Sequence, residues 1–228
     1  MHNIELAIFD MAGTVVNEKN VVYKTLQKAI NKKGHDLSLD FVLEHGAGKE
    51  KHQAIKDVLT AIKVDKEEEP SEPIFEDFKS MLDDAYDTLS VTSFEGVEQL
   101  LDNLKSQNIK IALNTGYNTK IAELLLRKMQ WEKGKQFDAL VTADDVSKGR
   151  PDPAMIYRAM EILGVEKASE VLKAGDSIID IEEGKNANCG VTVGVTTGAH
   201  TKAQLNSASP TFVLGSLSEL ADYIKGKS

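Results

Sequence analysis

The first apolar run of the chain ends in a carboxylate, and this arrangement constrains the fold more than any other feature of the sequence. Leu6–Phe9 leads directly into Asp10 and then into a turn that contains Gly13. Far downstream, a second short apolar run ends in a glycine followed by Asp176, with Asp180 four residues later. Because ligands of α/β proteins bind at the carboxyl ends of the strands, two acidic strand ends predict a site for magnesium and phosphoryl transfer.

Short apolar runs recur along the chain and alternate with helical patterns. Such runs are typical of strands that are buried on both faces of a parallel sheet. They lie at Glu5–Phe9, Ile109–Asn114, Phe137–Thr142, Val171–Ala174, Val191–Val195 and Thr211–Leu214. The helical patterns lie at Glu95–Gln107, Asn118–Met129, Pro153–Leu163, Ile178–Asn188 and Ser218–Lys225. The alternation predicts βαβ units and a doubly wound, Rossmann-like α/β sheet.

A long interruption, residues 17–92, separates the first strand from the rest and contains no convincing strand. Its helical patterns lie at Val21–Lys33, Ser38–His45, Lys49–Ile62 and Pro73–Leu89, with an acidic linker at Asp65–Glu72. We interpret the interruption as an all-helical cap that is inserted into an α/β core made of residues 1–16 and 93–228. The chain passes between the core and the cap twice, near Val15–Asn20 and Leu89–Phe94, and these two connections would form the hinge.

The net charge, the length of the apolar runs and the single cysteine argue against several classes of function. The net charge of −9 and the lack of a compensating basic block argue against nucleic acid as a partner. No apolar run approaches the ~20 residues of a membrane span, and the first run is too short for a signal peptide, so a cytoplasmic location is the default expectation. The single cysteine, Cys189, excludes an intrachain disulfide framework and is better explained as a small buried residue than as a nucleophile. The apolar first cap helix could pair two chains into a homodimer, although burial within the cap explains it equally well.

The acidic strand ends supply a candidate nucleophile and candidate metal ligands. A carboxylate such as Asp10 can attack phosphorus in line and form an aspartyl phosphate. Together with Asp176 and Asp180 it offers the oxygen ligands that Mg²⁺ prefers, and the ion would offset the repulsion between Asp10 and an anionic substrate. The alternatives are a turn-capping role for Asp10 and a helix N-terminal charge for Asp180. Asp145, beside another strand end, is better explained as a loop or capping residue.

Two other segments supply groups for a phosphoryl ligand. Thr115 ends an apolar run and is followed by Gly116 and Tyr117, so its hydroxyl and the neighbouring N–H groups can hold phosphoryl oxygens. Arg150, just before a proline-started helix, can neutralise a carboxylate and a phosphoryl group bidentately. Lys148 competes for that role and ranks second, and a plain surface cation is the alternative for Arg150.

In their order along the chain, these motifs resemble those of the haloacid dehalogenase-like hydrolases, whose first motif is Asp-x-Asp-Gly-Thr. The resemblance covers the whole chain and is greatest for the phosphonatase-like branch, in which an arginine takes the place of the usual lysine of the third motif. It implies that Mg²⁺ is held by Asp10, the backbone carbonyl of Ala12 and Asp176, with Asp180 in support. It also implies that Ala12, Gly13 and Thr14 bind the substrate, a small phosphorylated or phosphonate molecule.

Ala12 departs from the family pattern, because most members have a second aspartate at that place. In those proteins the second aspartate protonates the departing alkoxide and then activates water. Alanine can do neither, and a poor leaving group departs slowly without an acid. The chain is therefore expected to be a weakened phosphatase or to release a leaving group that is not an alkoxide.

A segment of the expected cap, His45 to Ile55, offers a different chemistry. It resembles the Gly-x-x-Lys-x-x-His segment of phosphonoacetaldehyde hydrolases, with Gly46, Lys49 and His52 in the three places. There the lysine forms a Schiff base with the substrate aldehyde. When the carbon–phosphorus bond breaks, a protonated imine accepts the electrons, so that no acid is needed beside Asp10.

We therefore expect Lys49 to form the imine, since a helix N-terminus and a closed cap favour the neutral amine. His52, one turn further on, would shuttle the protons. A solvated start of a cap helix is the alternative for both. Asn20 and His45 stand near places where phosphonoacetaldehyde hydrolases usually carry cysteine and methionine. A phosphate monoester phosphatase of the phosphoglycolate phosphatase type, or a member that binds an anionic ligand without turnover, therefore stays open.

Overall fold

In the computed structural model, which describes residues 3–64 and 70–224, six strands form one parallel sheet. Its strand order is β5-β4-β1-β6-β7-β8. The strands are β1 (Leu6–Asp10), β4 (Lys110–Asn114), β5 (Ala139–Val141), β6 (Val171–Gly175), β7 (Val191–Val195) and β8 (Phe212–Leu214). The chain proceeds outward from β1 first in one direction and then in the other, which confirms the doubly wound α/β fold. This reversal leaves a crevice at the carboxyl end of β1.

Both faces of the sheet are covered by helices, and β1 shows why. Its side chains alternate between the faces: Leu6 and Ile8 pack on the side of α7 (Ala154–Leu163), whereas Ala7 and Phe9 pack on the side of α5 (Val97–Ser106). All four are fully buried, so the strand reads as a continuous apolar run. The helices around the sheet are α5 (Val97–Ser106), α6 (Thr119–Met129), α7 (Ala154–Leu163), α8 (Ile178–Asn186) and α9 (Lys202–Ser207).

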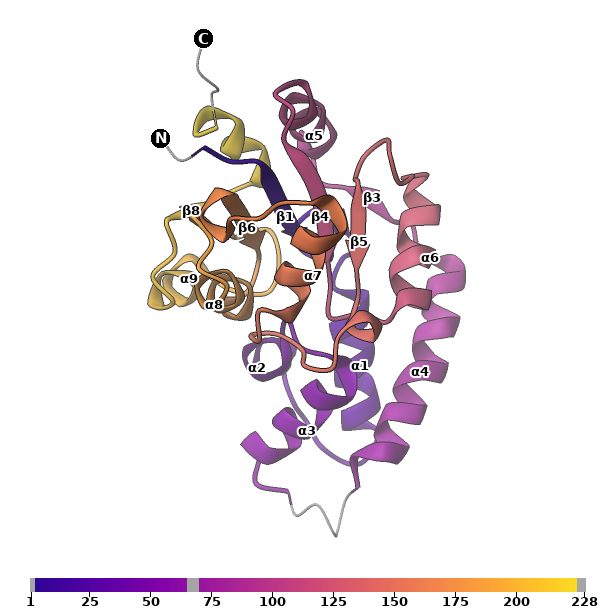
Figure 1. Cartoon of the computed structure of the whole chain (residues 1–228). Helices are drawn as coiled ribbons and strands as arrows, with labels where there is room; N and C mark the ends of the chain where they lie inside the picture. The colour runs from indigo at the N-terminus through magenta and orange to yellow at the C-terminus, as the bar shows by residue number, and fades with distance from the viewer. Residues whose placement is uncertain (1–2, 65–69, 225–228) are drawn as a thin grey trace.

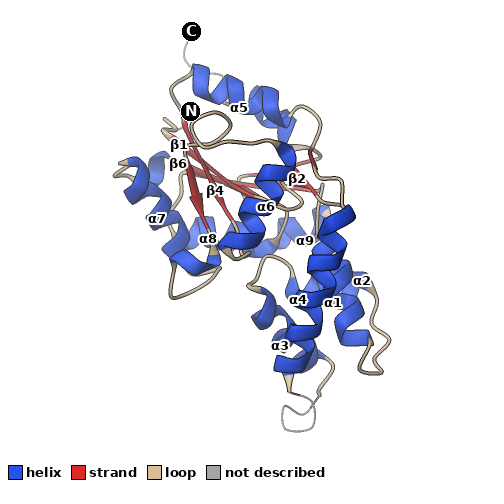
Figure 2. Ribbon diagram, turned by 90° about the vertical axis from the view of Figure 1, so that its right-hand side faces the viewer, coloured by secondary structure: helices blue, strands red, loops and turns tan. Residues whose placement is uncertain are grey.

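Four helices lie together beyond the carboxyl ends of the strands (Figures 1 and 2). They are α1 (Val21–Asn31), α2 (Leu39–Gly46), α3 (Lys51–Ala61) and α4 (Ser71–Thr88), and we call them the cap. Val22, Leu26 and Ile30 form the apolar face of α1, which is buried in the same core cluster as Ile74 and Phe78 of α4. That face is thus buried within the cap. Burial there was the alternative to a contact between two chains.

The two segments that connect the cap to the core form a short antiparallel pair of strands. β2 (Val16–Asn17) and β3 (Thr92–Ser93) form an antiparallel ladder in which Val16 lies opposite Ser93. The expectation that residues 17–92 contain no strand was therefore wrong at both ends. Strands of two residues are too short to produce a periodic sequence pattern.

Most other elements begin and end within two residues of their expected bounds. The last helix is an exception: residues 217–222 form a 3₁₀ helix, η3 (Leu217–Asp222), instead of an α-helix over Ser218–Lys225. The six-residue α9 was not expected, because it is too short for its apolar residues to repeat. Residues 65–69 of the expected acidic linker lie outside the described residues, and its end, Ser71 and Glu72, begins α4. None of the described helices combines the length and the apolar character needed to cross a membrane.

Candidate active site

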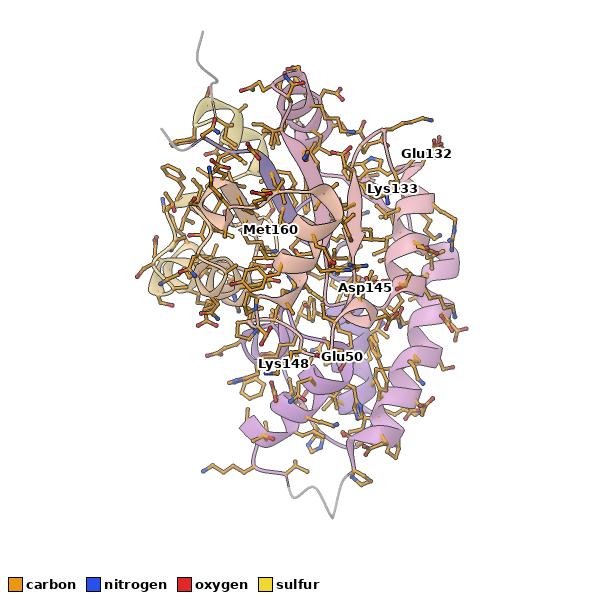
Figure 3. All side chains as sticks on the ribbon, viewed as in Figure 1. Glu50, Glu132, Lys133, Asp145, Lys148 and Met160 are labelled. Atoms are coloured by element: carbon orange, nitrogen blue, oxygen red, sulfur yellow. The ribbon has the colours of Figure 1, made fainter. Side chains whose placement is uncertain are left out.

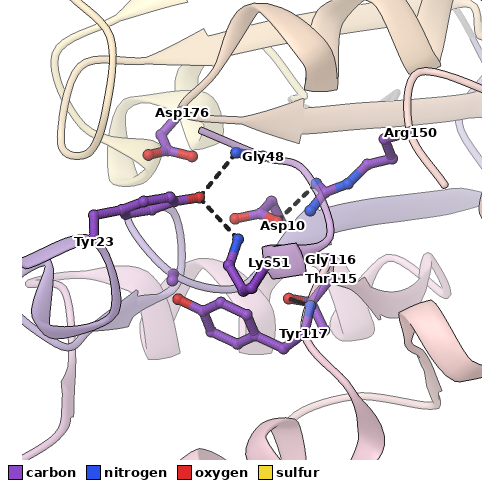
Figure 4. A pocket seen from close by; sticks show the side chains of 10 residues that line it. Asp10, Tyr23, Gly48, Lys51, Thr115, Gly116, Tyr117, Arg150 and Asp176 are labelled. Carbon is purple, nitrogen blue, oxygen red and sulfur yellow. Dashed lines mark hydrogen bonds and ion pairs between the residues drawn. The ribbon is translucent and has the colours of Figure 1, made fainter. Parts of the chain in front are cut away.

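A pocket opens where the carboxyl ends of β1, β4 and β6 face the cap (Figure 4). Core and cap both contribute to its walls. The lining residues are Asp10, Ala12, Tyr23, Gly48, Lys51, Thr115, Gly116, Tyr117, Arg150 and Asp176.

Asp10 and Arg150 form a buried ion pair at the pocket. Nη1 of Arg150 donates to Oδ1 of Asp10 at 2.8 Å and also to Oδ1 of Asp180. The Nε–H of Arg150 is buried without a hydrogen-bond partner among the described residues. The guanidinium thus fixes the carboxylate of Asp10 and keeps a further donor for an anionic ligand.

Behind this pair lies a buried charge network around Lys173, which no sequence motif predicted. Lys173 of β6 is fully buried, and its Nζ lies 2.9 Å from Asp180, 3.3 Å from Glu183 and 2.6 Å from Oδ1 of Asn114. The amide of Asn114 in turn donates to both carboxylate oxygens of Glu183. The signal in the sequence was a lysine in the middle of an apolar strand, because a buried lysine requires charged partners.

Asp176 is held at the pocket by backbone that approaches it closely. Its Oδ2 accepts a hydrogen bond from the N–H of Ala199 at 2.6 Å. A Cβ atom at Gly13 would lie 2.3 Å from that oxygen, and one at Gly198 would lie 1.9 Å from it. Gly13 also has a φ of +84°. Only glycine is compatible with these two positions.

The donor set fits a divalent cation. Oxygen atoms of Asp10, Asp176 and Asp180 lie within 4.8 Å of one another. Burial, followed by repulsion from the neighbouring carboxylates, raises the pKa of Asp10 and of Asp176. When Asp10, Asp176, Asp180 and Glu183 are all ionised and Lys51 is neutral, the charges of Arg150 and Lys173 leave two negative charges uncompensated. This is the charge that Mg²⁺ would neutralise.

Asp180 differs from the other two carboxylates because both of its oxygens are engaged by neighbouring residues. Burial alone would raise its pKa, but the charges of Lys173 and Arg150 outweigh burial and lower the pKa to about 2. Its Oδ2 accepts hydrogen bonds from the N–H and the hydroxyl of Ser177. Asp180 thus supports Arg150 and the start of α8, whereas Asp10 and Asp176 present oxygens to the pocket.

The turn after β4 meets the cap. Thr115 is buried at the strand end, and its hydroxyl accepts a hydrogen bond from the N–H of Tyr117 at 3.2 Å. A Cβ atom at Gly116 would lie 2.9 Å from the carbonyl oxygens of Gly48 and Lys49. The glycine at this place therefore lets the loop of the cap lie directly on the sheet edge.

Six of the predicted site residues do not line the pocket: Gly13, Thr14 and Asp180 of the core, and Gly46, Lys49 and His52 of the cap. The ammonium of Lys49 donates to the carbonyl of His45 at 2.9 Å and pairs with Asp57. The ring of His52 hydrogen-bonds the hydroxyl of Ser71 at 2.9 Å and stacks on Phe75 within the cap. Gly46 ends α2, and its Cα faces Ala54 of α3. These three cap positions face other parts of the cap, and their contact with a substrate stays a prediction.

Lys51 is the cap lysine that enters the pocket (Figure 4). Its Nζ lies 3.2 Å from Oη of Tyr23 and donates to the carbonyl of Lys49 at 2.6 Å. It also lies 4.7 Å and 5.0 Å from the ring centroids of Tyr23 and Tyr117. Burial, aided by the positive charge of Arg150, lowers the pKa of Lys51 to about 8.

Local capping explains why Lys51 and not Lys49 faces the pocket. The carboxylate of Glu50 accepts hydrogen bonds from the N–H groups of His52 and Gln53, both at 2.9 Å, so that α3 begins at Lys51. The spacing Gly-x-x-Lys occurs twice here, as Gly46 to Lys49 and as Gly48 to Lys51. The histidine three residues further on favoured the first register, and the structure brings the second to the pocket.

Thr14, Lys148, Asp145 and Cys189 also lie outside the pocket. Thr14 is fully buried beneath it, and its hydroxyl has no partner among the described residues. Lys148 is exposed on the loop before α7, and Asp145 completes the capping box of the 3₁₀ helix at residues 143–145 (Figure 3). Burial raises the pKa of the Cys189 thiol to about 12, as expected for a packed cysteine rather than a nucleophile.

Comparison with known proteins agrees with this geometry. The family model described as haloacid dehalogenase-like hydrolase matches residues 7–194. A phosphonoacetaldehyde hydrolase of Bacillus cereus (strain B4264) is 30% identical over 207 residues, which cover 86% of this chain and 77% of that protein. A phosphonoacetaldehyde hydrolase of Parabacteroides distasonis is 41% identical over 109 residues, which cover 48% of this chain and only 40% of its relative. The crystal structure of a phosphonoacetaldehyde hydrolase-like protein from Oleispira antarctica superposes with a TM-score of 0.83 at 22% identity, covering 97% and 91% of the two chains.

Proposed function

Because the chain belongs to the haloacid dehalogenase-like hydrolase family, we propose that it is a Mg²⁺-dependent hydrolase that transfers a phosphoryl group to Asp10. We further propose that it cleaves the carbon–phosphorus bond of phosphonoacetaldehyde, or of a closely related aldehyde phosphonate, through a Schiff base on Lys51. The observation that carries this proposal is the buried amine of Lys51 in the same pocket as Asp10, Thr115 and Arg150.

Imine formation comes first. The neutral amine of Lys51 adds to the aldehyde carbon, and the carbinolamine loses water to give a protonated imine. A pKa near 8 means that an appreciable fraction of Lys51 is neutral at neutral pH. The rings of Tyr23 and Tyr117 flank the nitrogen, which accommodates its positive charge before and after the condensation.

Cleavage of the carbon–phosphorus bond follows. A carboxylate oxygen of Asp10 attacks phosphorus, the bond to carbon breaks, and its electron pair moves into the iminium to give an enamine. Arg150 and Thr115 hold the phosphonate oxygens. Water then hydrolyses the aspartyl phosphate, and protonation and hydrolysis of the enamine release acetaldehyde and restore Lys51.

The pocket chemistry is consistent with alanine at position 12. Ala12 lines the pocket beside Asp10 and offers no acid, and an electron-accepting imine makes such an acid unnecessary. Mg²⁺ would be held by Asp10, Asp176 and the backbone carbonyl of Ala12, and it would supply charge neutralisation for the phosphoryl group.

The test is reductive trapping of the full-length protein with phosphonoacetaldehyde and cyanoborohydride, read by peptide mass spectrometry. We expect a reduced adduct on Lys51 in the wild type and in Lys49→Ala, and none in Lys51→Ala. Without reductant, Lys51→Ala should lose about 10³-fold or more in phosphate release, whereas Lys49→Ala should stay within a few-fold of the wild type. Hydrolysis of phosphate esters with Mg²⁺ and no adduct would instead identify a phosphate monoester phosphatase.

A further inference from the structure

A buried histidine lies in the loop between β7 and α9, outside the lining of the pocket. His200 is 6% exposed. Nδ1 of its ring accepts a hydrogen bond from the N–H of Ile178 at 3.0 Å, so the neutral ring carries its proton on Nε2. Nε2 is itself buried and has no hydrogen-bond partner among the described residues. A buried donor without a partner destabilises a fold, so stability alone does not explain a histidine here.

The loop of His200 is joined closely to Asp176. Three hydrogen bonds between described residues connect it to residues 176–178, which follow β6. The N–H of Ala199 donates to Oδ2 of Asp176 at 2.6 Å, and the N–H of His200 donates to the backbone carbonyl of Asp176 at 3.2 Å. The third is the bond from Ile178 to the ring of His200. Only this third bond uses a side chain of the loop, so it is the contact that the residue type at position 200 controls.

The same loop also contacts the turn that follows β1. The hydroxyl of Thr197 donates to the carbonyl of Gly13 at 2.6 Å. A Cβ atom at Gly13 would lie 3.0 Å from Cα of Gly198, so the two backbones lie directly against each other. The loop thus leans on the turns after both strands whose ends carry Asp10 and Asp176.

We infer that His200 positions Asp176 as a ligand of Mg²⁺, an inference that rests on the Mg²⁺ dependence of the proposed function. By holding the N–H of Ile178, the ring keeps the loop where the N–H of Ala199 meets Oδ2 of Asp176. That N–H fixes the rotation of a carboxylate that lines the pocket beside Asp10. His200 acts through Asp176, since its own ring does not line the pocket.

The physical reason is pre-organisation of the ligand. A carboxylate that is already held in one orientation loses less rotational freedom when it binds a cation. Residues that orient a metal ligand typically change the metal affinity by about 10–100-fold when they are removed. His200 is two bonds removed from the carboxylate, through the loop backbone and Ala199, so we expect an effect at the lower end of that range.

A purely structural role for His200 predicts a different result. His200→Phe leaves the N–H of Ile178 without its acceptor, but it also removes the unpaired Nε2–H from the interior. These two changes act on stability in opposite directions. We therefore expect the melting temperature to change little. A structural role would leave the metal affinity of the folded protein unchanged, whereas a positioning role lowers that affinity.

The experiment titrates the full-length protein with Mn²⁺, a paramagnetic substitute for Mg²⁺, and measures the free ion by EPR; displacement by Mg²⁺ then gives the affinity for Mg²⁺. We expect His200→Phe to bind both ions about tenfold more weakly than the wild type. His200→Asn, whose side-chain oxygen can take the place of Nδ1, should recover most of the affinity. His35→Phe, the same change in the loop between α1 and α2, is the control and should bind as the wild type does.

The outcomes distinguish this inference from the proposed function. A wild-type protein that binds neither ion would refute the Mg²⁺ dependence itself. Wild-type affinity in folded His200→Phe would overturn the role of His200 and leave the Mg²⁺ dependence intact. Equal weakening in His200→Phe and His200→Asn would also overturn it, because the effect would not depend on an acceptor at Nδ1. Should His200→Phe fail to fold, His200→Gln, with its oxygen one methylene further out, replaces it, and affinity equal to that of His200→Asn would overturn the inference.

Discussion

Nζ of Lys51 lies 3.2 Å from the phenolic oxygen of Tyr23, which also accepts a hydrogen bond from the N–H of Gly48 at 2.9 Å. One hydroxyl on α1 therefore fixes both the loop that enters the pocket and the lysine that follows it. Since the loop also lies against Gly116 of the core, Tyr23 connects the packing of the cap with the position of the amine.

Tyr23→Phe removes this shared acceptor and is expected to leave a buried N–H group and a buried ammonium short of a partner. We expect the free energy of unfolding to fall by about 1–3 kcal/mol, as measured by denaturant titration. Reductive trapping at Lys51 should slow by about tenfold, because the amine loses its orientation. Tyr157→Phe, an exposed tyrosine on α7, should change neither quantity. Equal trapping rates in the two variants would contradict the positioning role.

Gly116→Ala should hinder the contact between cap and core without disturbing either part. The added Cβ would lie 2.9 Å from two backbone carbonyl oxygens of the cap loop. Because backbone cannot yield as a side chain does, we expect kcat/KM for phosphate release to fall by about 10²-fold, with the melting temperature nearly unchanged. At Gly149 a Cβ would meet nothing within 4 Å, so Gly149→Ala is the matched control. Full activity in Gly116→Ala would show that the contact is not needed.

Removal of metal should destabilise the protein at neutral pH. The folded-state pKa of Asp176 is raised by burial and by Asp10, so the ionised carboxylate costs stability, and this cost disappears as the pH falls through that pKa. We therefore expect added Mg²⁺ to raise the melting temperature at pH 7, and acidification without metal to raise it as well. In Asp176→Asn the metal-free protein should be more stable by about 1 kcal/mol and should respond little to Mg²⁺. Calorimetry with Mg²⁺ and with a chelator measures both effects, and an undiminished metal response in Asp176→Asn would exclude Asp176 as a ligand.

Lys173→Met should be among the most destabilising single changes. Lys173 is fully buried between Asp180, Glu183 and Asn114. Its loss leaves Glu183 without its cation and Asp180 with Arg150 alone, and a buried pair that loses one partner costs about 3–5 kcal/mol. The double variant Lys173→Met with Glu183→Gln should regain part of this loss, because it restores the charge balance. Denaturant unfolding of both proteins measures the difference, and additive losses would argue against a coupled network.

Much of the fold follows from local patterns. Apolar runs such as Leu6–Phe9 must be covered on both faces, and their alternation with helical segments leads to a doubly wound sheet. Short elements escaped prediction for the same reason: β2, β3 and α9 contain too few residues for a period to be seen.

Some residues of the candidate site could likewise be predicted from the sequence, and others could not. Asp10 is the last residue of its strand, and Thr115 and Asp176 directly follow theirs, so that their meeting at one sheet edge is a consequence of topology. Lys173 carried only the signal of a lysine inside an apolar strand, and its partners Asp180 and Glu183 became known from the structure alone.

By itself the sequence determined the α/β core, the helical cap, the family and the strand ends that carry the acidic groups, since each depends on residue order and spacing. Only the tertiary structure decided which cap lysine faces Asp10. Two lysines, Lys49 and Lys51, satisfy the same Gly-x-x-Lys spacing. The choice between them depends on where Glu50 starts α3 and on how Tyr23 and Gly116, distant in the chain, hold the loop. Spacing along a chain specifies neighbours on one helix, whereas the direction of a side chain into a pocket is set by contacts between helices.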